Sequence, residues 1–184
     1  MNPVAKFNWD DADKAAREWG ANCGPGAIAA VLDKKIDEIR PFMGDFEKKH
    51  YTNPKLMLEI LNKMGVKFWK PRAQTWPRNG LIRIQWEGPW TDLGVPLRKR
   101  YRHTHWVASR WIGIDIFIFD INCICVGGWV HVGEWEKKVV PWLLKEVEPK
   151  AYGTYYPTHI LALQENFFDA IRGDPDMPDD DRNY

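Results

Sequence analysis

Apolar residues in the first third of the chain are spaced as they are in helices. Residues 22–33 (NCGPGAIAAVLD) are almost continuously small or apolar, which predicts a buried and closely packed central helix. Asn22 is expected to cap this helix, and Pro25 suits its first turn. Residues 54–64 predict a second helix, with Asn53 as its cap and an apolar stripe that faces the core.

From residue 66 onward the pattern changes to short segments typical of strands. Six strands are predicted, at 66–69, 81–86, 105–111, 114–121, 126–132 and 156–163. Residues 135–147 carry apolar side chains at helical spacing, although Pro141 obscures where that helix begins. Helices followed by strands predict an α+β fold with a mostly antiparallel sheet.

The length of 184 residues suits one compact domain, and no linker or internal repeat divides the chain. We expect a single domain over 1–172 and a disordered tail over 173–184, where five Asp accompany almost no apolar residue. Eleven Trp residues suggest a core or groove lined with rings.

Charge and cysteine content narrow the function. With 26 basic and 25 acidic residues the net charge is +1, so a nucleic-acid partner is not expected. No apolar run is long enough to span a membrane, so no membrane partner is expected either. The N-terminus lacks the pattern of a secretory signal, and three Cys cannot form a disulfide framework. We therefore expect a cytoplasmic protein.

Cys23 is the first candidate for chemistry, because it lies where a loop enters the predicted central helix. Unpaired N–H groups and the positive end of the helix dipole both favour a thiolate there. Gly24 and Gly26 flank the thiol and would let a substrate backbone approach closely. A nucleophilic thiol also needs a base, and the base needs a group that orients it.

His105 and Asp120 are the candidates for base and orienting group. If residues 112–113 form a two-residue hairpin loop, Trp111 faces Ile114 and His105 lies directly opposite Asp120. Facing side chains of an antiparallel pair are about 4.5–5.5 Å apart at Cβ, which is close enough for a carboxylate to orient an imidazole. The strand 114–121 is apolar on both faces, so a carboxylate at its end needs a partner.

Two neighbours offer alternatives. His103 shares a face with His105 and is the rival base. Asn122 lies two residues beyond Asp120 and would orient the histidine if the hairpin slipped by two positions. His105 is preferred because it begins the apolar strand and pairs with Asp120.

Residues 22–27 (NCGPGA), 105–108 (HWVA) and 119–122 (FDIN) together resemble the papain-like cysteine peptidases. Within that superfamily the order and spacing are most similar to the bacterial double-glycine leader peptidases, over about residues 20–165. The resemblance implies a papain-like fold in which the Cys-bearing helix packs on an antiparallel sheet. It implies Cys23 as nucleophile, His105 as general base and then acid, and Asp120 as the orienting carboxylate.

One position departs from the family. A Gln shortly before the Cys usually completes the oxyanion hole with its amide, whereas position 17 here is Arg. The Cys23 backbone N–H would supply one donor and the Asn22 amide a second, while Gly24, Asn122 and Trp19 complete the expected oxyanion and substrate-binding set. Losing one oxyanion donor lowers turnover by about 10²–10³. A weak or inactive binding protein of the same fold is therefore the alternative.

Three further motifs have two interpretations each. Cys123 and Cys125 could help to bind zinc, but the spacing lacks a CxxC pair and favours plain strand cysteines, so neither metal nor cofactor is expected. The basic run 98–102 is either a solvated loop or a site for an acidic substrate. Gly127 and Gly128 either line a peptide groove or form a β-bulge.

The expected reaction is thiolate attack on an amide carbonyl, formation of a thioester acyl-enzyme, and hydrolysis. A peptide or isopeptide bond of a peptide or protein substrate is favoured. Deamidation, acyl transfer to an amine, and hydrolysis of a small-molecule amide use the same three residues and stay open, as does the oligomeric state.

Overall fold

A computed structural model describes residues 3–44, 46, 50–100 and 102–164 of the chain. The predicted tail over 173–184 and the domain boundary at 172 lie outside the described residues. In the part of the chain that is described, no helix combines the length and the apolar character needed to cross a bilayer.

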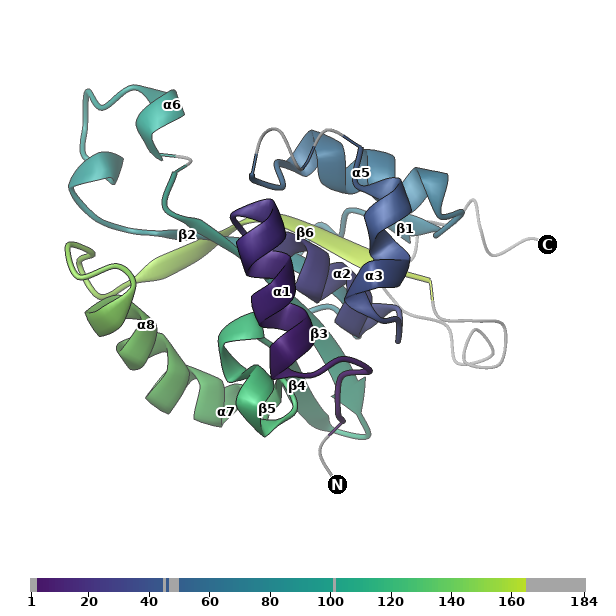
Figure 1. Ribbon diagram of the computed structural model, residues 1–184. Coiled ribbons are helices and arrows are strands. Elements are labelled where there is room, and N and C mark those ends of the chain that lie inside the picture. The colour runs from purple at the N-terminus through teal and green to yellow at the C-terminus, as the bar shows by residue number, and fades with distance from the viewer. Residues whose placement is uncertain (1–2, 45, 47–49, 101, 165–184) are drawn as a thin grey trace.

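The fold is mixed helix and sheet, as the sequence predicts (Figure 1). The α-helices are α1 (Trp9–Trp19), α2 (Cys23–Val31), α3 (Ile36–Ile39), α5 (Pro54–Lys63), α6 (Leu97–Arg100), α7 (Val132–Glu134) and α8 (Val140–Glu146). Three short 3₁₀ helices are η1 (Arg40–Phe42), η2 (Pro89–Thr91) and η3 (Ile121–Val126). The segment η4 (Trp135–Val139) is a π-helix. The strands are β1 (Phe68–Trp69), β2 (Asn79–Trp86), β3 (Thr104–Ile112), β4 (Asp115–Phe119), β5 (Trp129–His131) and β6 (Tyr155–Leu163).

The six strands form one sheet in the order β1-β6-β2-β3-β4-β5, and every neighbouring pair is antiparallel. One face of the sheet packs against α1, α2, α3 and α5, which lie together in Figure 1. The other face packs against η4 and α8 through a second apolar cluster. The alternating side chains of β4 divide between these cores, because Phe117 and Phe119 join the first while Ile116 and Ile118 join the second.

The central helix α2 is as buried as predicted, with eight of its nine residues inside the core. Its small residues permit this, because a side chain at Gly26 would collide with Ile121. Helix α5 also confirms its prediction, since Asn53 accepts a hydrogen bond from the Leu56 N–H and Gly65 follows the helix with a positive φ of 69°.

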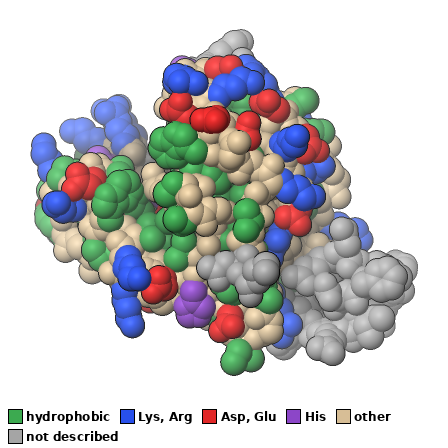
Figure 2. Space-filling view, turned by 60° about the horizontal axis from the view of Figure 1, so that its bottom comes forward, with side chains coloured by type: hydrophobic (Ala, Val, Ile, Leu, Met, Phe, Trp, Pro, Cys, Tyr) green, Lys and Arg blue, Asp and Glu red, His purple; other side chains and the backbone are tan. Residues whose placement is uncertain are grey.

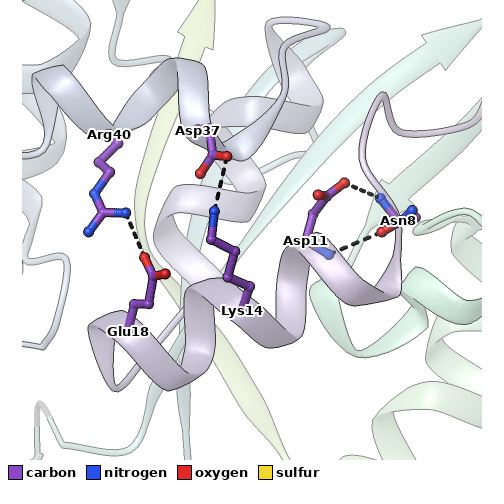
Figure 3. Close-up of polar contacts among 6 residues, drawn as sticks. All are labelled: Asn8, Asp11, Lys14, Glu18, Asp37 and Arg40. Carbon is purple, nitrogen blue, oxygen red and sulfur yellow. Dashed lines mark hydrogen bonds and ion pairs between the residues drawn. The ribbon is translucent and has the colours of Figure 1, made fainter.

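Helix α1 was not predicted from the sequence. Only three of its residues are buried (Ala12, Ala15 and Trp19), so the helical spacing of apolar side chains is weak in the sequence. Its N-terminus carries a capping box in which Asn8 and Asp11 exchange hydrogen bonds. Ion pairs then join it to the segment that follows α2, from Lys14 to Asp37 and from Glu18 to Arg40 (Figure 3).

The predicted register of the β3–β4 hairpin is wrong by two residues. Ile112 faces Asp115, so the two-residue loop is Gly113–Ile114 and Trp111 faces Ile116. Gly113 has a φ of 63° and takes the first loop position, where a type II′ turn needs glycine. Because the shift is an even number, each side chain keeps the face that was predicted for it.

The structure also settles two predictions for the second half of the chain, the strand at 126–132 and the start of the helix near Pro141. The predicted strand 126–132 shortens to β5, because Gly127 and Gly128 have φ values of 93° and 82° and lie in the turn that ends η3. A side chain at Gly128 would collide with Phe119, so this glycine gives room to the core. Pro141 falls in the first turn of α8, directly after the π-helical η4, which is where a missing N–H disturbs the helix.

The surface mixes both signs of charge. On the face seen in Figure 2, basic and acidic side chains are interspersed with apolar ones. That distribution agrees with a net charge of +1 built from nearly equal numbers of each kind.

Candidate active site

Cys23 is the first residue of α2, and its side chain is half-buried. Asn22 occupies the N-cap position, but its side chain makes no capping bond, so that prediction is wrong. Its amide donates instead to the carbonyl oxygen of Ala12 in α1, at 2.9 Å. The first turn of α2 therefore keeps its N–H groups free of a side-chain cap, and they remain available to a charge on the sulfur.

His105 and Asp120 meet although they are not directly opposite in the sheet. With the observed register, alternation places His105 across from residue 122, so Asp120 is a diagonal neighbour on the same face. His105 Nε2 and Asp120 Oδ1 are 3.0 Å apart, and the two residues are 8% and 0% exposed. This pairing leaves Nδ1 of the ring for a bond with the Cys23 thiol, which interacts with His105.

The carboxylate of Asp120 is held by three further donors. The backbone N–H and the side-chain amide of Asn122 reach Oδ1 at 3.0 and 2.8 Å. The indole N–H of Trp135 reaches Oδ2 at 3.0 Å, and Trp135 is fully buried. A buried charge needs such donors, and here both carboxylate oxygens have them. Asn122 thus fixes Asp120 and does not replace it.

Trp135 is a site residue that sequence reasoning missed. It belongs to η4, fifteen residues after Asp120, and nothing in its local pattern marks it. A buried indole does require an acceptor for its N–H, which is the one general signal that could have drawn attention to it.

Electrostatics favour an ion pair between Cys23 and His105. Burial opposes the charged form of His105, but the charge and hydrogen bond of Asp120, with help from Cys23, raise its pKa to about 10. Burial likewise opposes ionised Asp120, yet His105, Trp135 and Asn122 lower its pKa to about 2. For Cys23, the bond to His105 and the imidazolium charge outweigh burial and lower the pKa.

Two backbone groups also stabilise the thiolate. The N–H groups of Trp106 and Gly24 hydrogen-bond to the sulfur and contribute to the lowered pKa of Cys23. Trp106 follows His105 in β3, at a point that the β4 ladder does not reach, because that ladder begins at Ala108. One strand therefore supplies both an imidazole and an N–H to the sulfur.

The predicted substrate-binding residues are placed differently from expectation. Trp19 is 1% exposed and packs edge-on against Phe46, so it lies in the core and cannot contact a substrate. Gly24 makes room for Thr52, whose hydroxyl would be 2.1 Å from a Cβ at that position, and not for a ligand. Arg17, at the position where the papain-like peptidases that the sequence resembles have Gln, pairs with Asp13 and has a side chain that is 72% exposed.

The rival histidine has other partners. His103 Nδ1 and Glu148 Oε2 are 2.8 Å apart, and the ring stacks on Trp90 with 3.5 Å between centroids. Of the two histidines, His105 alone bonds to Asp120 in the described structure.

The remaining motifs do not contribute a side chain to the triad. Cys123 is buried, and burial together with the Asp120 charge raises its pKa to about 12, while Cys125 is exposed. In the basic run 98–102, the guanidinium of Arg100 donates to the carbonyl oxygens of Val95 and Asp92, which ties part of the run to its own loop.

The site thus brings together Cys23 from α2, His105 from β3 and Asp120, which directly follows β4 and caps η3. A thiolate beside an imidazolium that a buried carboxylate orients is equipped to attack a carbonyl and to protonate a leaving group. Comparison of the chain with protein-family models finds no match, and comparison with the curated proteins finds none either.

Proposed function

We propose that the protein is a cysteine peptidase-like hydrolase that cleaves an amide bond, in a peptide or an isopeptide linkage. The observation that carries the proposal is the hydrogen-bonded order of Cys23, His105 and Asp120, with both oxygens of the buried carboxylate satisfied. Strongly shifted pKa values that come from specific charge partners around a half-buried thiol are typical of catalytic groups, and they support the proposal.

The papain-like fold is part of the same proposal. Its support is the order of elements: a buried helix that starts with Cys precedes an antiparallel sheet. One strand of that sheet carries His105 near its start, and the next strand leads directly into Asp120.

In the proposed reaction the Cys23 thiolate attacks the amide carbonyl and forms a tetrahedral oxyanion. The His105 imidazolium gives its proton to the leaving amine as the C–N bond breaks, which leaves a thioester on Cys23. Neutral His105 then takes a proton from water, whose oxygen attacks the thioester and releases a carboxylic acid. The thiolate and the imidazolium are restored, and one water is consumed for each amide.

The weakest part of this site is the oxyanion hole. The Asn22 amide is bonded to Ala12, and Arg17 is exposed and paired with Asp13, so the Cys23 N–H is the donor that the helix start offers. This supports a second candidate, a papain-like binding protein with little or no turnover. A substrate amide would have to draw Asn22 away from α1 to complete the hole.

Trapping of the acyl-enzyme tests the proposal. The full chain is mixed with a library of peptide and isopeptide amides, quenched in acid, and analysed by intact mass. We expect an acyl adduct that a Cys23→Ala variant lacks and that a Cys125→Ala variant, which removes an exposed thiol, retains. A folded chain that yields neither an adduct nor hydrolysed product from peptides and small amides would contradict the proposal and favour the binding protein.

A further inference from the structure

The segment that joins β2 to β3, residues 87–103, forms an arm that projects beyond the sheet and carries α6 (Figure 1). Four of the five residues in the run 98–102 are basic, whereas the acidic residues of the whole arm are Glu87 and Asp92. The chain as a whole carries a net charge of only +1. Positive charge is therefore concentrated in the arm, which leads directly into the strand that carries His105.

Both acidic side chains of the arm are bonded to the segment that leads into β6. Asp92 accepts hydrogen bonds from the Tyr152 hydroxyl at 3.0 and 3.2 Å, and Glu87 accepts one from the Thr154 hydroxyl. Within the described residues neither carboxylate forms an ion pair. The acidic groups of the arm thus hold it in place and leave its cations uncompensated.

Three of the four cations in the run are open to a ligand from solvent. Arg98, Lys99 and Arg102 are exposed, and they form no ion pair with the residues that the structure describes. The fourth, Arg100, is half-buried, and its guanidinium donates to two backbone carbonyls of the arm. The arm therefore presents three accessible positive charges on a backbone that its fourth cation helps to hold.

The base of the arm is fastened to the sheet. The His103 ring stacks on Trp90 with 3.5 Å between centroids and lies 2.8 Å from Glu148 Oε2. The indole N–H of Trp90 donates to the Trp86 carbonyl at 2.7 Å. The Gln85 amide donates to the His103 carbonyl at 2.8 Å. These contacts fix where the chain leaves β2 and enters β3, so the cations are pre-organised relative to the site.

The chain itself limits the distance from the cations to the site. Arg102 precedes His105 by three residues, so their Cα atoms are at most about 11 Å apart. The Arg102 N–H bonds to the Lys99 carbonyl at 3.4 Å, which closes a turn and keeps these two Cα atoms within about 7 Å. An extended peptide rises about 3.3 Å per residue. A substrate residue about three to five positions from the cleaved amide therefore comes level with the cations when the peptide runs along the arm.

We propose that Arg98, Lys99 and Arg102 select an acidic peptide as substrate, with Asp or Glu about three to five residues from the amide that is cleaved. The inference rests on the proposed hydrolase function, since it names the substrate class of that site. Carboxylates are the groups of a peptide that guanidinium and ammonium donors bind through charge-assisted hydrogen bonds. A nucleic acid is the poorer match, because one short basic run on a chain of net charge +1 does not form the basic face that such a partner needs.

Binding is tested first with the full chain carrying Cys23→Ala, so that the result does not depend on turnover. The probes are a fluorescein-labelled peptide of alternating Glu and Ala and the same peptide with Gln in place of Glu, followed by fluorescence anisotropy. An exposed ion pair strengthens binding by up to about fivefold, so at about 0.01 M salt the Glu peptide should bind about tenfold more tightly. That preference should shrink at about 0.15 M salt, because the Debye length falls from about 30 to about 8 Å.

A matched pair of charge reversals locates the effect. Lys99→Glu should lower the preference for the Glu peptide about fivefold, because an attraction becomes a repulsion. Lys137→Glu, at an exposed position of η4, should leave the preference unchanged. Equal affinity for the two peptides, equal losses in the two variants, or tighter binding of a thymidine oligonucleotide of the same charge would overturn the proposal.

Turnover separates this inference from the proposed function. Among peptides that acylate the unmodified chain, one Glu should speed acylation most when it lies about three to five residues from the cleaved amide, compared with Gln at the same position. Acylation at equal rates by Glu and Gln peptides would overturn the selection of acidic substrates and leave the hydrolase in place. Binding that depends on Lys99 without any acyl-enzyme would support recognition of acidic peptides and contradict the hydrolase.

Discussion

The hydrogen bond from Trp135 to Asp120 can be tested by the substitution Trp135→Phe. This change removes the indole N–H that lies 3.0 Å from Oδ2 and leaves that oxygen buried without its donor. A hydrogen bond to a charged group contributes about 1.5–3 kcal/mol. At 1.36 kcal/mol per unit, its loss would raise the pKa of Asp120 by about one to two units from its present value of about 2.

The substitution also removes packing, so a matched control is needed. Trp129 is 1% exposed, and its indole N–H has no partner in the described structure, so Trp129→Phe loses ring contacts without losing a hydrogen bond. Urea unfolding of both variants at neutral pH should leave Trp135→Phe the less stable by about 1.5–3 kcal/mol.

The pH dependence separates the charge from the packing. Asp120 has a folded-state pKa below its ordinary value of 3.8, so its contribution is present above pH 3.8 and is lost as the pH falls toward 2. The difference between the two variants should therefore shrink as the pH falls through this window. Equal stabilities at neutral pH, or a difference that does not change with pH, would refute the role given to Trp135.

Two further predictions concern the helix start and the histidine. Gly24→Ala would place a methyl group 2.1 Å from the Thr52 hydroxyl and 2.5 Å from its Cβ, so it should destabilise the fold although alanine favours helices, and adding Thr52→Gly, which removes both atoms, should restore part of the loss in urea unfolding. His105 has a pKa raised from 6.5 to about 10, so its contribution to stability is fully present below pH 6.5 and is lost as the pH rises toward 10. His105→Gln should accordingly be less stable than wild type at pH 6 and approach it near pH 10, and a constant difference across this range would contradict the ion pair.

Helices α2 and α5 and the run of strands were predictable, because apolar residues follow helical spacing in the first part of the chain and form short strand-like segments in the second. Helix α5 has a cap, a first-turn Pro and an apolar stripe, and the strands alternate between two cores. The association of His105 with Asp120 was predictable for a narrower reason. The expected register was wrong, but an error of two residues preserves the face, and the face decides which side chains can meet.

The roles of Asn22, Trp19 and Trp135 could not be predicted, because they depend on contacts between segments that are distant in the sequence. The role of Asn22 could not be read from its neighbours, because its amide is taken by Ala12 of a helix that the sequence did not reveal. Trp19 is close to Cys23 in sequence, yet α1 turns it into the core. Trp135 reaches Asp120 only because η4 packs over the far face of the sheet. None of these contacts has a periodic signature.

The rate at which iodoacetamide alkylates Cys23 across the pH range tests the central claim most directly. With His105 present, the thiol should react at lower pH than an ordinary thiol, and much faster than buried Cys123. In His105→Ala, burial acts on the thiol without its main opposing interaction, so the rate at neutral pH should fall about tenfold or more. An unchanged rate and pH profile in that variant would contradict the thiolate–imidazolium pair on which the proposed chemistry rests.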